Sequence, residues 1–285
     1  MKICRFDDDR LGLVEGDEIV DVTAALDALA PRWPAPMGDP LIAGWPALLG
    51  PVTEAAKGAR RVPVATARLM SPLTAPSKII GIARNRKNLE KESLNFELAK
   101  NARQDSDPIE MFIKAPSAMV GASEGVALRF PDGRNDPEVE LTVIIGTRCT
   151  DVACDDALDV VFGYTIGLDM TLRGKGSASS RKSIDSFAPL GPWIVTADEI
   201  ADPDNLSSSL AINGAAVQEA TTRDLAFDVR SLIAHASSWY TLHPGDAIMV
   251  GTPVGFQPVH DGDVMVASFE GIGAMTVAVR THRRG

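Results

Sequence analysis

From about residue 78 onward the chain consists of short apolar runs that are separated by Gly, Pro and Asp turns. The strand candidates span residues 125–130, 139–147, 162–172, 191–197, 209–214, 247–252 and 263–279. The Asn213-Gly214 pair favours a tight hairpin, and one amphipathic helix is expected over residues 227–240. Strands without regular helix alternation exclude Rossmann and TIM-barrel folds and predict an α+β, mostly β architecture.

The first 70 residues have a different pattern and predict a small N-terminal α+β domain. Strand candidates at 2–6 and 18–23 precede an Ala-rich helix candidate at 23–30, and a Pro-rich passage follows. The two prolines in "SPLTAPSK" disfavour a helix and predict a linker. We therefore expect a division into residues 1–70 and a larger catalytic domain over residues 71–285.

The composition argues against several classes of partner. Asp and Glu number 38 against 28 Lys and Arg, for a net charge of −10, which disfavours binding to a nucleic-acid backbone. The three cysteines lack the paired spacing of metal ligands, so reduced thiols are expected. No apolar run resembles a signal peptide or a membrane span. We expect a cytoplasmic protein that binds neither nucleic acid nor membranes.

The segment "DPEVELTVIIG" (136–146) is the most informative about chemistry. Side chains alternate faces along a strand, so Glu138 and Glu140 are expected on one face. Two adjacent carboxylates repel each other and are costly to bury, and a divalent cation would remove that cost. The alternative is a strand that begins in solvent with both glutamates exposed.

A second strand candidate carries Asp169 in an otherwise apolar run, "VVFGYTIGLDMTL". Three carboxylates from two strands suit a hard cation such as Mg²⁺ or Mn²⁺. Alternatively, Asp169 caps a nearby turn. The residues alone leave both interpretations open.

Several motifs occur in an order that resembles the fumarylacetoacetate hydrolase family over roughly residues 70–285. They are "EVELTVIIG", "GYTIGLDMT", "RKSIDSFAPLGPWIVTADEI" and the long run from "INGAAVQEA" to "GDVMVASFEGIG". The resemblance implies a β-roll core with a small N-terminal domain, assembled as a homodimer or a higher homo-oligomer. It also implies a Mg²⁺ or Mn²⁺ site at Glu138, Glu140 and Asp169.

The resemblance further implies a reaction on a small 2-oxo acid substrate. We expect a hydrolase that cleaves a carbon–carbon bond of a 2,4-diketo, acylpyruvate-type acid. The segment around residues 168–200 is similar to a branch of sugar-acid and aromatic-degradation enzymes, which implies cleavage of 2,4-diketo-3-deoxy-L-rhamnonate to pyruvate and L-lactate. Two alternatives remain: an oxaloacetate-type decarboxylase or keto–enol isomerase, and a catalytically inactive protein that binds a keto acid.

Residues for substrate binding carry over by motif. They are Arg84, Asn85, Lys114, Lys182 and Thr252. The resemblance implies that Lys182 also acts in catalysis, by holding a carboxylate or an enolate oxygen together with Thr252. The Gly- and Ser-rich segment before Lys182 suits a mobile lid.

The segment after Asn85 departs from the family pattern. Many members have a tyrosine, a histidine and a glutamate where this chain has Arg86, Leu89 and Glu92. The histidine of the usual base pair is therefore missing. We expect Glu92 to act alone as the general base, with Glu90 or Lys87 as possible substitutes.

Overall fold

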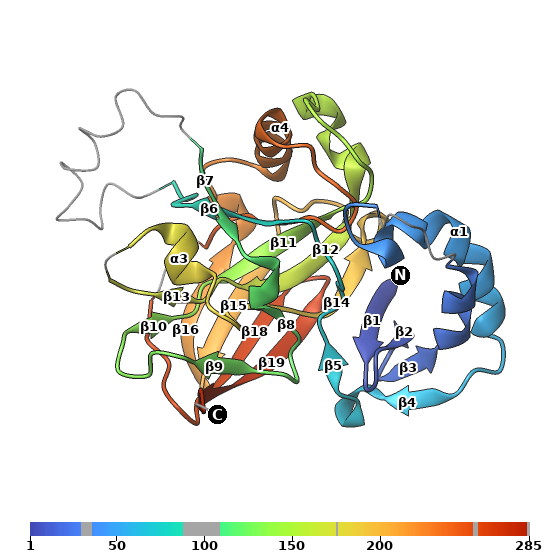
Figure 1. The fold of residues 1–285 in the computed structure, drawn as a ribbon, viewed down its shortest axis with the longest axis horizontal. Helices are drawn as coiled ribbons and strands as arrows, with labels where there is room; N and C mark the ends of the chain where they lie inside the picture. Colours follow the sequence, from blue (N-terminus) through green and yellow to red (C-terminus); the bar gives the residue numbers. More distant parts are fainter. Residues whose placement is uncertain (30–35, 88–108, 175, 253–255, 284–285) are drawn as a thin grey trace.

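The structure is a computed structural model that describes residues 1–29, 36–87, 109–174, 176–252 and 256–283. Two large β-sheets form the body of the molecule, and the N-terminal strands form one end of the larger sheet (Figure 1). The expected α+β, mostly β fold is confirmed. Within the described residues, no helix is long and apolar enough to cross a membrane.

The larger sheet runs continuously from the N-terminal strands into the core. Its order is β4 (Arg61–Pro63), β3 (Glu18–Asp21), β2 (Arg10–Glu15), β1 (Lys2–Phe6), β14 (Ala188–Thr196), β12 (Val161–Leu168), β11 (Val139–Ile145), β17 (Ala247–Met249), β6 (Ile79–Ala83) and β7 (Glu110–Lys114). The short strands β5 (Leu69–Met70) and β8 (Met119–Val120) pair with β1 and β14. The antiparallel pair β1–β14, with Ile3 opposite Ile194, joins the N-terminal strands to the core.

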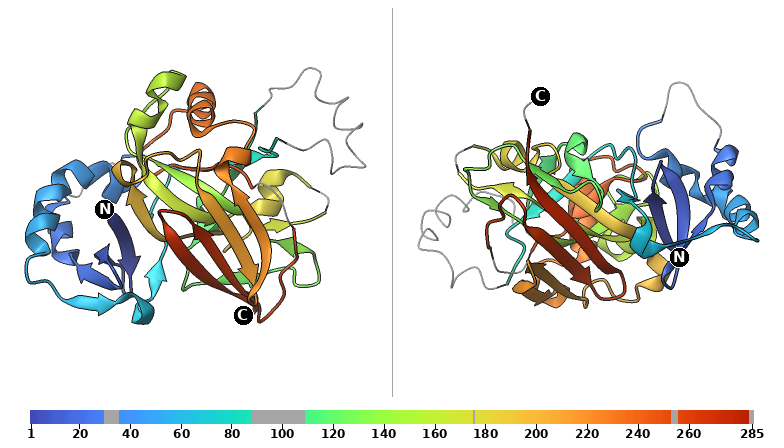
Figure 2. Two further views of the ribbon diagram at one scale, coloured as in Figure 1. Left: turned by 180° about the vertical axis from the view of Figure 1, so that it is seen from behind. Right: turned by 90° about the horizontal axis from the view of Figure 1, so that it is seen from below.

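The second sheet packs against the central strands of the first (Figure 2). Its order is β16 (Ala215–Thr221), β15 (Ser207–Ile212), β18 (Val264–Phe269), β19 (Gly273–Thr281) and β9 (Val126–Leu128). Asn213 and Gly214 have φ angles of 51° and 82° and join β15 to β16, which confirms the predicted hairpin. A small ribbon pairs β10 (Asn135–Asp136) with β13 (Thr171–Leu172).

Alternation along the central strands produces the core. Leu141 and Val143 of β11 point toward the second sheet and pack in one cluster with Leu210 of β15. Ile144 points to the opposite face, where it packs in a second cluster with Ile194 of β14. Both faces of β11 are therefore buried, as its continuous apolar run predicts.

The helices are few in the described part of the chain. They are α1 (Pro40–Ala55), α3 (Ala178–Lys182) and α4 (Val229–Trp239), and short 3₁₀ turns connect several strands. Helix α4 confirms the amphipathic helix expected over residues 227–240. The Ala-rich segment 23–30 instead forms a 3₁₀ helix over Thr23–Ala28.

Helix α1 was not predicted, because the Pro-rich passage before it obscured its start. Asp39 caps this helix by accepting hydrogen bonds from the backbone N–H groups of Leu41 (2.9 Å) and Ile42 (3.2 Å). Its other carboxylate oxygen accepts from the backbone N–H of Ala75 at 2.9 Å, so Asp39 ties the expected linker to the helix. The division into residues 1–70 and 71–285 stays a prediction.

Candidate active site

The pairing of β11 with β12 brings three carboxylates together. Val139 lies opposite Leu168, and the backbone N–H of Asp169 donates to the carbonyl of Glu138 at 2.8 Å. One carboxylate oxygen from each of Glu138, Glu140 and Asp169 lies within 4.8 Å of the other two, and all three side chains are buried. The cluster therefore arises from strand register, because a one-residue slip would move Glu140 to the other face.

Two rows of polar side chains extend this cluster along the β10–β13 ribbon. One row is Asp136, Glu138 and Glu140, and the other is Asp169, Thr171 and Arg173. Asp136 lies opposite Thr171 in the ribbon. Arg173 crosses between the rows and donates to Asp136 Oδ2 at 2.7 Å and to Glu138 Oε1 at 2.6 Å.

Two buried lysines supply positive charge to the cluster. Lys182 of α3 donates through Nζ to Glu138 Oε2 at 2.8 Å and to Thr171 Oγ1 at 2.7 Å, and it also contacts Asp169. Lys114 of β7 donates to Asp169 Oδ1 at 2.5 Å. Burial alone would raise the pKa of Asp169, but the two ammonium groups outweigh it and hold that pKa below its usual value.

Of the three carboxylates, Glu140 has the least compensation of its charge by these cations. Among the described residues, no Lys or Arg lies within ion-pair distance of it, and its Oε2 accepts from the backbone N–H of Gly251 at 2.8 Å. Burial raises the pKa of Glu140 well above its usual range, and the charges of Asp169 and Glu138 raise it further. Three convergent oxygen donors with one uncompensated carboxylate fit a divalent cation.

Thr252 and Gln218 connect the cluster to the second sheet. Gln218 of β16 is buried, and its Oε1 accepts from the backbone N–H of Val139, between the two glutamates, at 3.0 Å. Its Nε2 donates to Thr252 Oγ1 at 3.1 Å. Because the Thr252 oxygen already accepts this bond, its own proton is available to an acceptor in the pocket.

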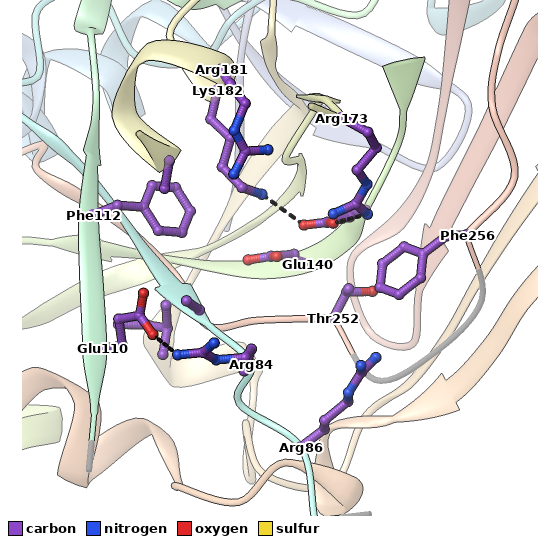
Figure 3. A pocket seen from close by; sticks show the side chains of 14 residues that line it. Arg84, Arg86, Glu110, Phe112, Glu140, Arg173, Arg181, Lys182, Thr252 and Phe256 are labelled. Atoms are coloured by element: carbon purple, nitrogen blue, oxygen red, sulfur yellow. Dashed lines mark hydrogen bonds and ion pairs between the residues drawn. The ribbon is translucent and has the colours of Figure 1, made fainter. Parts of the chain in front are cut away.

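A cavity of about 330 Å³ opens in front of the carboxylates, a size that suits a small organic acid (Figure 3). Its described lining is Ile82, Ala83, Arg84, Arg86, Glu110, Phe112, Glu138, Glu140, Arg173, Ala178, Arg181, Lys182, Thr252 and Phe256. The carboxylates Glu138 and Glu140, with the buried Asp169 behind them, lie on or next to the paired strands β11 and β12, and we call them the acidic wall. The segment after β6 and helix α3 supply most of the arginines.

The segment after β6 turns sharply at Arg84, whose φ of 56° lies in the left-handed region. Arg84 and Arg86 then line the cavity, while Asn85 between them points into the protein. The Asn85 amide donates to the carbonyls of Val250 (2.7 Å) and Phe227 (3.1 Å). Asn85 thus connects two backbone segments by hydrogen bonds and does not line the described pocket.

The predicted site residues therefore occupy distinct places. Arg84, Glu138, Glu140, Lys182 and Thr252 line the cavity. Asp169 and Lys114 lie buried behind them, joined by their ion pair. Glu92, Leu89 and Glu90 lie outside the described residues.

Several lining or supporting residues were missed by the sequence analysis. They are Gln218, Arg173, Arg181, Phe112 and Phe256. A signal existed for Arg173, because period-two alternation from Asp169 through Thr171 reaches it. Phe256 had no local signal, since it reaches the pocket through tertiary packing.

Comparisons with known proteins agree with this geometry. Residues 78–280 match the family described as fumarylacetoacetate (FAA) hydrolase C-terminal. The maleylpyruvate hydrolase of Aquipseudomonas alcaligenes is 47% identical over 286 residues, which cover 99% of this chain and 100% of that protein. The 2,4-didehydro-3-deoxy-L-rhamnonate hydrolase of Sphingomonas sp. (strain SKA58) is 36% identical over 206 residues, covering 67% of this chain and 72% of that protein.

A solved structure is similar over the whole chain. The crystal structure of maleylpyruvate hydrolase from Sphingobium sp. SYK-6, in complex with manganese(II) ion and pyruvate, superposes with a TM-score of 0.83 at 39% identity. The match covers 99% of this chain and 100% of that one. The sequence motifs, the fold and these matches agree, and this chain belongs to the fumarylacetoacetate hydrolase family.

Proposed function

We propose that this chain is a metal-dependent hydrolase that cleaves a carbon–carbon bond of an acylpyruvate. The observation that carries the proposal is the buried carboxylate triad, which opens onto a small pocket lined by Lys182 and Thr252. The 47% identical maleylpyruvate hydrolase supports hydrolysis as the class of reaction.

Glu138, Glu140 and Asp169 would hold the metal, Mg²⁺ or Mn²⁺. A divalent cation there would supply Lewis-acid polarisation of the keto oxygens of the substrate. The similar structure that contains manganese(II) and pyruvate supports both the metal and the end of the substrate that binds it.

Lys182 and Thr252 would bind the pyruvoyl end. The Lys182 ammonium is held by Thr171 and by two carboxylates, so it presents a fixed positive charge at the cavity wall. Such a charge stabilises a carboxylate or an enolate oxygen more strongly in a partly buried site than in water. Thr252 would donate its proton to an oxygen of the same substrate.

Hydrolysis also needs a base that takes a proton from water. Water would add to the acyl carbonyl, the bond between that carbonyl and the adjacent CH₂ would break, and protonation of the pyruvate enolate would give pyruvate and a carboxylic acid. Glu92 stays the sequence-based prediction for this base.

The substrate has two candidates from the sequence and from the relatives. One is maleylpyruvate, on which the 47% identical relative acts by its name, and the other is 2,4-diketo-3-deoxy-L-rhamnonate. The decarboxylase and isomerase alternatives use the same metal but consume no water. The homo-oligomer and the cytoplasmic location stay predictions.

A product assay separates these activities. The protein, loaded with Mn²⁺ or Mg²⁺, is offered acetopyruvate, maleylpyruvate, 2,4-diketo-3-deoxy-L-rhamnonate and oxaloacetate. Release of pyruvate together with the matching acid, lost with chelator and restored with metal, is expected for an acylpyruvate. Carbon dioxide release from oxaloacetate, or tautomerisation without cleavage, would instead favour the alternatives, and unchanged turnover in chelator would overturn the metal-dependent mechanism.

A further inference from the structure

Asp136 is a fully buried carboxylate that the proposed reaction does not use. It lies in the β10–β13 ribbon, two residues before Glu138, and it is not among the residues that line the described cavity. Burying a carboxylate is costly unless charged partners satisfy it. The partners of Asp136 therefore indicate what this charge does so close to the proposed metal ligands.

Two arginines satisfy Asp136, and they lie in different surroundings. Arg134 donates through Nε to Oδ1 at 3.0 Å, and Arg173 donates through Nε to Oδ2 at 2.7 Å. The Arg134 side chain is 54% exposed. The Arg173 side chain is 34% exposed and lines the cavity. Asp136 is thus paired with one arginine near solvent and with one at the site.

Arg173 extends this contact to Glu138. It donates through Nη2 to Glu138 Oε1 at 2.6 Å, while Lys182 donates to Oε2 at 2.8 Å, so both oxygens of this carboxylate are held (Figure 3). A guanidinium is planar and rigid, so a partner that fixes its Nε also fixes the direction of its Nη2. The Phe256 ring, whose centre lies 4.6 Å from the guanidinium, further limits its movement.

A purely structural role for Asp136 would not require Arg173. The backbone already closes the ribbon, since Asp136 pairs with Thr171 and the N–H of Arg173 donates to the carbonyl of Arg134 at 2.8 Å. Arg134 also supplies a charged partner by itself. The ion pair with Arg173 adds one consequence that these contacts do not have, which is control over the orientation of Glu138.

We propose that Asp136 is a positioning residue that acts through Arg173 to hold Glu138 in the orientation that binds the metal. The inference rests on the proposed function, because Glu138 is one of its three metal ligands. Removal of the groups that hold metal ligands from behind typically lowers metal affinity by about 10- to 100-fold. Asp136 thus determines how tightly the site holds its cation without contacting the cation or the substrate.

The test measures Mn²⁺ affinity of the full chain by electron paramagnetic resonance, which needs no substrate. Asp136→Asn keeps the shape of the side chain and removes its charge, and it is expected to weaken Mn²⁺ binding by about 10- to 100-fold. Asp246→Asn is the matched control, because Asp246 is also fully buried and pairs with Lys78 outside the described pocket lining. Both variants are expected to lose thermal stability, but Asp246→Asn should keep wild-type Mn²⁺ affinity. Equal Mn²⁺ affinities of the two variants would overturn the proposal.

A double variant separates positioning from a simple effect of charge. If Asp136 acts through Arg173, adding Asp136→Asn to Arg173→Gln should change Mn²⁺ affinity by less than about threefold. A full loss in that background would overturn the proposal, since an effect of the Asp136 charge alone does not need Arg173.

Two further outcomes are covered by the same measurement. Should Asp136→Asn not fold, Arg173→Lys keeps the positive charge but lacks the planar group that contacts both carboxylates, and it is expected to weaken Mn²⁺ binding at least about tenfold. Wild-type affinity in Arg173→Lys would overturn the proposal. If the wild type binds Mn²⁺ but hydrolyses no acylpyruvate, the proposed function fails, while the comparison of Mn²⁺ affinities still decides the role of Asp136.

Discussion

The two walls of the pocket are built in different ways. The acidic wall is carried by paired strands, and its carboxylates are placed by the register of β11 against β12. The basic wall is carried largely by a turn after β6 and by the five-residue helix α3. Arg84 holds its place with a left-handed backbone and an ion pair to Glu110, and not with a strand ladder.

Because of this difference, we expect one wall to determine the reaction and the other to determine which substrate is preferred. Strand register tolerates little change, because moving one carboxylate moves the whole row. Turns and short helices on a rigid scaffold accept new side chains more easily. We therefore expect substitutions in the acidic wall, and of the catalytic Lys182, to impair activity towards every substrate, and substitutions of the arginines in the basic wall to change the preferred substrate.

The largest effect is expected for Glu140→Gln, which breaks the acidic wall. The amide keeps the shape of the side chain and an acceptor for Gly251, but it removes the negative charge of a proposed metal ligand. Metal affinity, measured by Mn²⁺ electron paramagnetic resonance, should fall at least about tenfold and kcat at least about a thousandfold. The Tm of the metal-free variant should not fall, because burial and the neighbouring Asp169 and Glu138 disfavour a negative charge at this position and raise the pKa of Glu140. Wild-type Mn²⁺ affinity would remove Glu140 from the ligand set.

Lys182→Ala is expected to have the next largest effect. Its ammonium neutralises Glu138 and Asp169 and lines the cavity, so kcat should fall about a hundredfold. In metal-loaded protein the Tm should change by only a few degrees, because the bound cation neutralises the same carboxylates. Steady-state kinetics and thermal unfolding test this together. Wild-type kcat and KM would make Lys182 a structural counter-ion only.

Gln218→Leu tests whether the acidic wall depends on the second sheet. The change leaves the backbone N–H of Val139 without its acceptor, at a cost of about 1–3 kcal/mol in the free energy of unfolding. We expect kcat to fall roughly tenfold as Thr252 loses its donor. Glu219→Gln, on the exposed face of the same strand, is the matched control. Equal behaviour of the two variants would show that Gln218 is not a positioning residue.

The smallest effect is expected for Lys57→Ala, far from both walls. Its ion pair with Glu54 is exposed at the end of α1, and such pairs contribute little. The Tm should move by less than about 2 °C and kcat should stay within experimental error. A loss of activity here would mean that the N-terminal unit influences the pocket more strongly than its contacts indicate.

The acidic wall could be predicted from the sequence because it follows one rule. Period-two alternation placed Glu138 and Glu140 on one face, and an apolar run made Asp169 conspicuous. The same rule, carried two and four residues past Asp169, would also have found Thr171 and Arg173. The mostly β fold was predictable for a similar reason, since strand patterns and the Asn213-Gly214 turn are local signals.

The basic wall could not be predicted in this way. The positive φ of Arg84 determines which side chains of residues 84–86 face the cavity. No local sequence pattern predicts a positive φ at an arginine. The resemblance assigned Asn85 to substrate binding, whereas its amide is used by two backbone carbonyls. Gln218 was missed because its partners lie far away in sequence and become neighbours only when the two sheets pack.

The Gln218 contacts also set a limit on redesign of this fold. The edge strand β16 is exposed along much of its length, which makes its hairpin an attractive place to graft loops. Yet an insertion that advanced the strand by one residue would turn Gln218 outward and present a neighbour to Val139 in its place. A loop grafted into the β15–β16 hairpin could thus break the contact between Gln218 and β11, which lies in the other sheet. The length of the hairpin must therefore be kept even where its sequence is free to vary.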